Sequence, residues 1–310
     1  MAADGTNSAP KKIFMWLNPR SISTAFEKCV SFMDGAQNWH EPYLTCLFND
    51  LFEDEETFKT FPGMKVFAKQ FHDAEKLVET GGHPYQGGNL RLSKDFNWDW
   101  VKEQLEGPLA EGKTFMFIKD AAFSIDGHYD KLPEVPSKHT FLLRHPHRTA
   151  LSVRHVLSHL YEFPGKEEDF DIQSGHPFMQ WEKLSRDPMY NLWNYVRENI
   201  DPNPVVIDAD DLQNHPEQML RKYCEAVGIP FKKKFLKWEK SDEYLRGFYG
   251  SLDQLVWGKN EGVYDSAMLS TCFRPPKGPI PEKAPDNCIA YVNEIMDGYN
   301  KMYETRIKPE

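Results

Sequence analysis

The sequence has no long run of apolar residues, and its 310 residues carry a formal charge of −10 at neutral pH. Its apolar stretches are far shorter than the roughly 20 residues of a membrane-spanning helix, so we expect no membrane span. The negative charge argues against nucleic acid as a partner, because that binding needs a basic surface. Residues 1–11 lack the apolar core of a secretory signal. We expect a disordered lead there and a single α/β domain over residues 12–310.

Cysteines are few, and their number is odd. No two of them form a Cys-x-x-Cys pair, which argues against a disulfide framework and against the usual zinc-site spacing. Free, buried thiols in a reducing compartment are the simplest expectation, and they favour a cytoplasmic location. The five residues are Cys29, Cys46, Cys224, Cys272 and Cys288.

The chain also lacks an ATP-binding phosphate loop in the context where such a loop works. Residues 107–114 match the pattern Gly-x(4)-Gly-Lys-Thr, but a functional loop follows a strand and opens a helix. Here residues 98–105 have a helical pattern and residues 115–118 a strand pattern, so the order is inverted. We therefore interpret Gly112 as a helix stop.

Short apolar segments alternate with amphipathic helical patterns along the chain. This alternation predicts an α/β fold with a central parallel sheet flanked by helices, in which ligands bind beyond the carboxyl ends of the strands. Residues 63–92 and 250–283 are rich in Gly and Pro and are expected to be irregular loops or lids. The expected strands are residues 13–17, 37–40, 114–118, 140–143 and 205–207, and the expected helices are residues 24–34, 145–160, 216–227 and 287–303.

The turn after the first expected strand is the most informative segment. A strand, a short polar turn and a helix start point backbone N–H groups and the positive end of a helix dipole at one place, which favours a phosphate. In the alternative, Ser23 or Thr24 simply caps the helix. The turn contains Arg20, Ser21, Ile22, Ser23 and Thr24.

A second basic element follows the expected strand 140–143. Arg144 ends this strand, Pro146 opens the next helix, and Ser152 lies eight residues after Arg144. A guanidinium group and a hydroxyl in this arrangement can hold a second phosphate. Two separate anion sites on one sheet predict a ligand with two separated phosphates.

Together these two elements resemble the cofactor-binding signatures of the sulfotransferase superfamily, whose members use 3'-phosphoadenosine 5'-phosphosulfate (PAPS) and release adenosine 3',5'-bisphosphate (PAP). The resemblance covers roughly residues 11–230. It is closest to a small, single-domain branch with a His-Glu-Pro or Asp-Glu-Pro motif, here His40, Glu41 and Pro42. It implies a P-loop-like sulfotransferase fold.

The resemblance also implies which residues hold the cofactor. The turn from Arg20 to Thr24 would hold the 5'-phosphosulfate, and Arg144 with Ser152 the 3'-phosphate. Ile22 stands where the family usually has Gly, so a positive φ is costly there. The family's Arg-Lys-Gly element has no clear match, but Arg274 with Lys277 and Gly278 is a candidate substitute.

For catalysis, the resemblance implies Glu41 as the general base, Lys119 as the group that stabilises the transferred sulfuryl group, and Arg20 as the cation near the bridging oxygen. Ala121 stands where cytosolic members carry a catalytic histidine. That difference favours Glu41 as the base and leaves Asp120 as a weaker candidate.

No metal is implied by the resemblance. His155 and His159 have the i, i+4 spacing of a metal pair, but the residues between them are Val156, Leu157 and Ser158, with no Glu of the metalloprotease type. We therefore expect no metal site.

The expected function is PAPS-dependent transfer of a sulfuryl group to a hydroxyl or amine of a small-molecule acceptor, which leaves alcohols, phenols, amines and sterols open, as well as the oligomeric state. One alternative is a nucleotide kinase or hydrolase with an atypical phosphate loop. Another is a nucleotide-binding protein without activity, which Ile22 and Ala121 would favour. Aromatic residues that could line an acceptor pocket, with core packing as their default role, are Trp39, Tyr43, Phe71, Tyr85 and Trp98.

Overall fold

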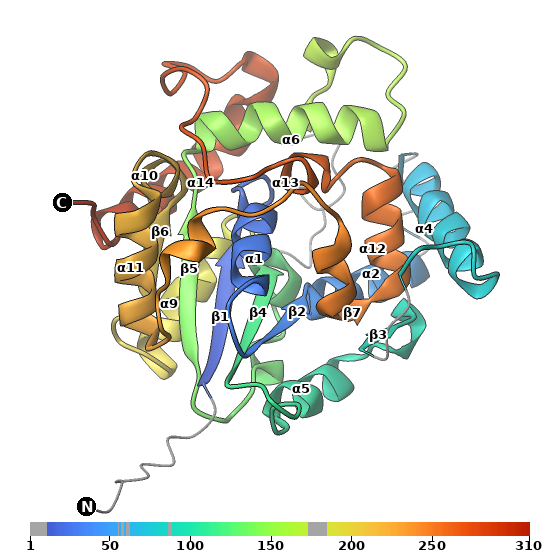
Figure 1. The fold of residues 1–310 in the computed structure, drawn as a ribbon. Coiled ribbons are helices and arrows are strands. Elements are labelled where there is room, and N and C mark those ends of the chain that lie inside the picture. Colours follow the sequence, from blue (N-terminus) through green and yellow to red (C-terminus); the bar gives the residue numbers. More distant parts are fainter. Residues whose placement is uncertain (1–10, 55, 57–58, 60–62, 86–88, 173–184) are drawn as a thin grey trace, which may run out of the picture.

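A single seven-stranded sheet forms the centre of the computed structural model, which describes residues 11–54, 56, 59, 63–85, 89–172 and 185–310 (Figure 1). All its strand pairs are parallel, in the order β3-β7-β2-β4-β1-β5-β6. This confirms the predicted α/β fold. The strands are β1 Lys11–Leu17, β2 Ala36–His40, β3 Leu90–Arg91, β4 Phe115–Ala121, β5 Lys138–Leu143, β6 Val205–Asp208 and β7 Phe248–Ser251.

The expected N-terminal lead falls mostly on residues 1–10, which lie outside the described residues; Lys11 already opens β1. Four predicted helices are present within three residues of their expected bounds, as α1, α6, α11 and α14. The described α-helices are α1 Ser23–Ser31, α2 Pro42–Glu53, α4 Gly63–Glu79, α5 Trp98–Glu106, α6 Pro146–Leu160, α9 Pro188–Asn199, α10 Ala209–Asn214, α11 Pro216–Val227, α12 Leu252–Asn260, α13 Asp265–Met268 and α14 Asp286–Glu304.

The sheet is buried on both faces, which explains why its central strands are apolar on both sides. Side chains of β1 alternate between two clusters. Ile13 and Met15 pack with α1 and α11 on one face, and Phe14 and Trp16 pack with α2, α5 and α9 on the other. The short strands that the sequence predicted are therefore the middle layer of a three-layer fold.

A third apolar cluster joins α4, α6, α12 and α14. In Figure 1, α6 crosses above the carboxyl ends of the central strands. These helices thus cover the edge of the sheet where ligands of α/β proteins bind.

The prediction that residues 63–92 and 250–283 are irregular was wrong for much of their length. The first segment contains α4, and the second contains the end of β7 with α12 and α13. Within α4, the buried side chains of Met64, Phe67 and Phe71 follow a helical spacing. The Gly and Pro residues of that segment lie at the first residue of α4 or beyond Glu79, so composition averaged over the segment concealed the helix.

Helix α5 precedes β4, so the inverted order that excludes an ATP loop at residues 107–114 is confirmed. Gly112 is not the helix stop, however, because α5 ends at Glu106 with Gly107 as its C-cap. All five cysteines are free, and four of them are buried. Among the described helices, none combines the length and apolar character that crossing a membrane requires.

One prediction concerns the contact of β7 with β2, which leads into the candidate site. A Cβ atom at Gly250 would lie 2.9 Å from the carbonyl oxygen of His40. Gly250→Ala should therefore push the two strands apart and lower the free energy of unfolding by about 1–3 kcal/mol, as measured by urea denaturation. At Gly247 an added Cβ meets no atom within 4 Å, so Gly247→Ala is the matched control. Equal losses in both variants would contradict this account.

Candidate functional site

Four neighbouring strands end at the same edge of the sheet and bring four predicted residues together. β2 is followed by Glu41, β4 contains Lys119, and the turns after β1 and β5 contain Arg20 and Arg144. His40 of β2 is paired with Lys119 of β4 in the sheet, and Glu41 N donates a hydrogen bond to Lys119 O at 2.8 Å. The predicted convergence at the carboxyl edge is therefore present.

The turn after β1 has a strained backbone. Arg20 has φ 70° and Ile22 has φ 63°, although a left-handed conformation costs an L-residue about 1–2 kcal/mol. Ile22 thus takes the positive φ that its side chain makes costly. Among the described residues, the non-glycine residues with positive φ are Arg20, Ile22, Glu41 and Glu162, so three of four lie at this site. Such strain concentrates where function requires a fixed geometry.

The start of α1 is not capped by a side chain. Ile22 is the N-cap residue, and no side chain accepts a hydrogen bond there, so the alternative in which Ser23 or Thr24 caps the helix is wrong. The hydroxyl oxygen of Ser21 is buried without a hydrogen-bond partner. Both features leave polar groups at the positive end of the helix available to an anion.

Two largely buried guanidinium groups lie beside this turn. Arg144 Nη1 donates to Arg20 O at 2.6 Å, and Arg20 Nε donates to Ser152 Oγ at 3.0 Å. No carboxylate lies within ion-pair distance of either guanidinium in the described part of the chain, and Arg144 Nε is buried without a partner. Ser152 therefore contacts Arg20, whereas we expected it to act with Arg144.

Burial lowers the pKa of both arginines, and the charge of Arg144 lowers the pKa of Arg20 further. The more distant carboxylates of Asp210 and Asp208 offset only part of the effect on Arg144. Two cations that repel each other in a partly dry site are stabilised by an anion between or beside them.

A buried acid–base cluster lies on the other side of the turn. Lys119 Nζ is 2.6 Å from Glu41 Oε1 and 3.6 Å from Glu27 Oε2. His40 Nδ1 is 2.8 Å from the same Glu27 oxygen. Glu27 is fully buried in α1. Sequence analysis missed Glu27, because a single Glu within an amphipathic helix carries no signal that separates it from a surface residue.

Two more polar residues of the cluster come from the segment that was predicted to be irregular. Gln254 Nε2 donates to Glu41 Oε2 at 3.0 Å, and His40 Nε2 lies 3.0 Å from the hydroxyl of Tyr264. Gln254 thereby positions the carboxylate of Glu41, and Tyr264 positions the imidazole of His40. Their assignment to a loop hid them from sequence analysis.

The charged groups of this cluster shift one another's pKa values. Burial acts to raise the pKa of Glu41, but the charges of Lys119 and His40 outweigh it, and the net effect is to lower that pKa. Burial acts to lower the pKa of Lys119, and the charges of Glu41 and Glu27 raise it instead. Glu41 is therefore ionised at neutral pH and able to accept a proton.

Asp120, the weaker candidate for the base, has structural partners. It is fully buried, and its carboxylate accepts hydrogen bonds from the backbone N–H groups of Tyr43 and Ala121 and from Ser124 Oγ. Burial and the charge of Glu41 raise the pKa of Asp120 to about 8. By bonding Tyr43 N, it caps the start of α2.

A cavity of about 230 Å³ opens between the strand ends and the helices that cover them. Arg20, Ser23, Thr24 and Glu41 are among its polar lining residues, with Asn18, Ser185 and Arg186, and most of its wall is apolar. None of the five aromatic residues suggested by the sequence lines it. The aromatic residues that do are Phe48, Phe67, Phe123, Tyr161, Trp257, Tyr264 and Tyr291.

The C-terminal candidates for the 3'-phosphate lie on one segment that contacts α10 through Arg274 and the start of α6 through Gly278. Arg274, Lys277 and Gly278 are all exposed. Gly278 O accepts a hydrogen bond from Arg148 Nη2 at 2.9 Å, and Arg148 Nε is 2.7 Å from Asp210. Arg148 thus ties this segment to the helix that follows Arg144.

The ammonium group of Lys119 should be essential for stability. Lys119→Met leaves a buried carboxylate without its cation and should lower the free energy of unfolding by about 3–5 kcal/mol. In the wild type the lowered pKa of Glu41 stabilises the fold at pH values above the pKa that Glu41 has in the unfolded chain. That contribution is lost as the pH falls below this value. In the variant, burial raises this pKa instead, so stability should fall as the pH rises from about 4 to about 7.

Denaturant titrations at several pH values test this prediction. The matched control is Lys138→Met, which removes a lysine whose exposed ion pair with Asp201 spans 3.0 Å. This control should lose at most about 1 kcal/mol. A Lys119→Met variant that gains stability as the pH rises would show that Glu41 does not depend on the lysine.

Parts of this chain are similar to known proteins. Residues 201–305 match a family model described as "Sulfotransferase domain". Branched-chain-amino-acid aminotransferase-like protein 2 of Arabidopsis thaliana is 53% identical over 114 residues, which cover 26% of this chain and 20% of that protein. Its relative, protein 1 from the same plant, is 53% identical over 74 residues, 24% of this chain and 12% of that protein. The chain thus spans about a fifth of these curated relatives or less.

Solved structures with a similar arrangement are more distant. The sulfotransferase domain from the curacin biosynthetic pathway is 16% identical with a TM-score of 0.47, covering 97% of this chain and 99% of that chain. A sulfotransferase from Alicyclobacillus acidocaldarius is 12% identical with a TM-score of 0.43, covering 73% and 88%. The family match runs from the loop before β6 to the end of α14, so it includes Arg274 and Gly278 but not Arg20 or Arg144. The resemblance of this chain to the sulfotransferase superfamily, predicted from its sequence, is confirmed.

Proposed function

We propose that this protein is a PAPS-dependent sulfotransferase that transfers a sulfuryl group to a hydroxyl or amine of a small-molecule acceptor. The observation that carries the proposal is the pair of largely buried guanidinium groups, Arg20 and Arg144, beside an uncapped helix start. Neither has a carboxylate partner among the described residues. Buried cations without anionic partners are costly unless a ligand supplies the negative charge.

The residues present fit PAPS. Ser21 Oγ and Arg144 Nε are buried polar atoms without partners, and both are suited to phosphate oxygens. Ser21, Ile22, Ser23 and Thr24 would hold the 5'-phosphosulfate with Arg20. Arg144 would hold the 3'-phosphate. Ser152, whose hydroxyl oxygen accepts from Arg20 Nε at 3.0 Å, would donate its own hydrogen to the same phosphate, and the segment with Arg274, Lys277 and Gly278 would complete that site. When bound, PAPS supplies an activated sulfuryl group on a phosphate leaving group.

The acid–base cluster supports the second half of the proposal. Glu41 is ionised and lines the cavity, so its carboxylate can take the proton of an acceptor hydroxyl or amine. Lys119 lies 2.6 Å from Glu41 and carries the positive charge that a transferred sulfuryl group needs beside it. Arg20 supplies the cation on the phosphate side. His40 and Gln254 hold Glu41 in place.

An apolar cavity next to Glu41 favours a small molecule as the acceptor. It excludes water from the reacting groups, which strengthens their electrostatic interactions. The negative charge of the chain offers no general surface for nucleic acid. The free, mostly buried cysteines fit a reducing compartment, and we place the reaction in the cytoplasm.

Two alternatives predict different ligands. A kinase or hydrolase would be stabilised by ATP or ADP with Mg²⁺, whereas a sulfotransferase would be stabilised best by PAP. An inactive nucleotide-binding protein would bind PAP and transfer nothing. A thermal-shift comparison of PAP, ATP and ADP, followed by transfer of labelled sulfuryl groups from PAPS to a panel of phenols, alcohols, amines and sterols, separates the three.

The first prediction from this proposal concerns binding. Arg144→Ala should weaken the affinity for PAP by about 2–5 kcal/mol, because a desolvated charged partner of the ligand is lost. Isothermal titration calorimetry measures this. Arg221→Ala removes an exposed arginine paired with Glu217 and should leave the affinity unchanged. If Arg144→Ala binds PAP like the wild type, Arg144 does not contact the 3'-phosphate.

The second prediction concerns turnover. Glu41→Gln keeps the shape of the side chain but cannot accept a proton, so it should lower the rate of sulfuryl transfer by roughly 10²–10⁴-fold and leave PAP affinity nearly unchanged. Glu217→Gln, at an exposed ion pair, is the control. Near-normal turnover by Glu41→Gln would remove this residue as the base.

A further inference from the structure

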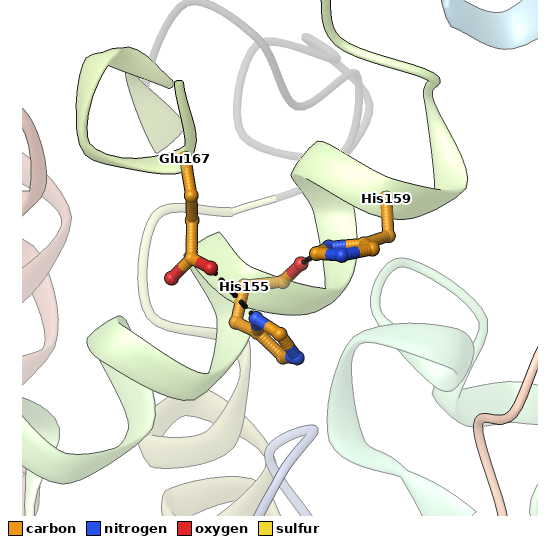
Figure 2. A group of neighbouring side chains, drawn as sticks. All are labelled: His155, His159 and Glu167. Carbon is orange, nitrogen blue, oxygen red and sulfur yellow. Dashed lines mark hydrogen bonds and ion pairs between the residues drawn. The ribbon is translucent and has the colours of Figure 1, made fainter. Parts of the chain in front are cut away.

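A cluster of metal-ligating side chains lies on the exposed side of α6, away from the cavity. His155 and His159 stand one turn apart, and Glu167 reaches them from the 3-10 turn Glu167–Asp169 (Figure 2). One ligand atom from each of the three residues lies within 4.8 Å of the others. We propose that His155, His159 and Glu167 form a binding site for one divalent transition-metal ion, with Zn²⁺ as the best fit.

The third ligand is what sequence analysis lacked. It expected no metal because no Glu lies between the two histidines. The fold supplies Glu167 instead, twelve residues beyond His155, and places its Oε2 atom 2.7 Å from His155 Nδ1. An ion would take the place of the hydrogen that these two atoms share, and the neutral imidazole of His155 would then carry its hydrogen on Nε2.

The hydrogen bond of His159 fixes its ring in a form suited to metal binding. His159 Nδ1 lies 2.7 Å from the backbone oxygen of His155 (Figure 2). A carbonyl oxygen only accepts hydrogen bonds, so Nδ1 carries the hydrogen. In the neutral ring, Nε2 then holds the free lone pair. Metal-bound histidines characteristically donate their other ring nitrogen to a carbonyl or carboxylate in this way.

The ligand set selects the class of ion. Two imidazoles and one carboxylate suit Zn²⁺, Cu²⁺, Ni²⁺ or Co²⁺, whereas Mg²⁺ and Ca²⁺ prefer oxygen ligands alone. Ligands on tetrahedral zinc lie about 3.3 Å apart, so the donor atoms of the three groups must move closer to one another. His155 and His159 are exposed and Glu167 is half-buried, so rotation of their side chains can supply this movement. Water would complete the coordination.

A bound ion would join the last turns of α6 to the turn at Glu167. The opposite face of α6 lines the cavity through Val156, Leu157 and Leu160. The ion would therefore stabilise one wall of the candidate site without touching the residues proposed for chemistry. This proposal does not depend on the proposed function.

The test is zinc titration by calorimetry on the full chain, stripped of metal with a chelator and carrying no affinity tag. The wild type should bind one Zn²⁺ saturably, and Mg²⁺ or Ca²⁺ in excess should not compete. Substituting either histidine by Ala, or Glu167→Gln, removes a direct ligand and should weaken zinc binding by at least the roughly 10–100-fold that loss of an outer-shell partner costs. Zinc should raise the melting temperature of the wild type and not that of the double variant His155→Ala with His159→Ala.

The matched control is His72→Ala. His72 is an exposed helical histidine 3.6 Å from Glu75, and among the described residues it belongs to no group of three metal-ligating side chains, so this variant should bind zinc like the wild type. Three results would overturn the proposal. They are no saturable zinc binding by the wild type, full affinity in the double variant, or full affinity in Glu167→Gln, which would leave fewer than three ligands.

Discussion

The candidate site depends on the ion pairs that the ammonium group of Lys119 makes with Glu41 and Glu27. This ammonium group lies between the carboxylates of Glu41 and Glu27; Lys119 and Glu27 are buried, and Glu41 is partly exposed to the cavity. Two carboxylates so close together would not both remain ionised in a dry environment without a cation. Because Lys119 belongs to the central strand β4, the sheet itself fixes the position of that charge. Loop movements cannot easily displace it.

The site is divided electrostatically by this arrangement. On the β5 side of the β1 turn lie Arg20 and Arg144, without carboxylate partners among the described residues. On the other side lies the cluster of Glu27, His40, Glu41 and Lys119. A ligand that spans the edge of the sheet would meet positive charge at its phosphate end and an ionised carboxylate at its reacting end. A purely positive site would hold the nucleotide and offer no base for the acceptor.

The sequence predicted the parts of the site that are local and missed those that tertiary structure creates. Arg20 and Arg144 were proposed because each follows a predicted strand, where parallel sheets place their ligands, and Glu41 and Lys119 were proposed from the family resemblance. The structure places all four near the carboxyl edge of the sheet, although β4 continues past Lys119 to Ala121. Glu27 was missed because burial of a helical Glu depends on what packs over it. Gln254 was missed because Gly and Pro residues nearby hid α12, and Tyr264 was missed because it lies in the turn between α12 and α13.

Contacts made by side chains were also beyond the sequence. Spacing alone paired Ser152 with Arg144, but Ser152 bonds to Arg20, because the direction of a long guanidinium side chain depends on the surrounding packing. The apolar wall of the cavity likewise comes from α4, α6, α12 and α14, and two of these helices were expected to be loops. Composition indicates that a core exists; it does not indicate which aromatic residues face a cavity.

The strain in the β1 turn can persist because α1 is held firmly below it. Phe26, Cys29 and Val30 are buried in one apolar cluster. Lys28 Nζ donates to the carbonyl oxygens of Ala267, Met268 and Ser270, at 3.0, 3.1 and 3.4 Å. With the helix anchored on one side and β1 fixed in the sheet on the other, the turn has little freedom to relax its positive φ angles. The turn is therefore shaped before any anion arrives, and less conformational entropy is lost when one binds. A relaxed turn would first have to be ordered by its ligand, and part of the binding free energy would be lost in doing so.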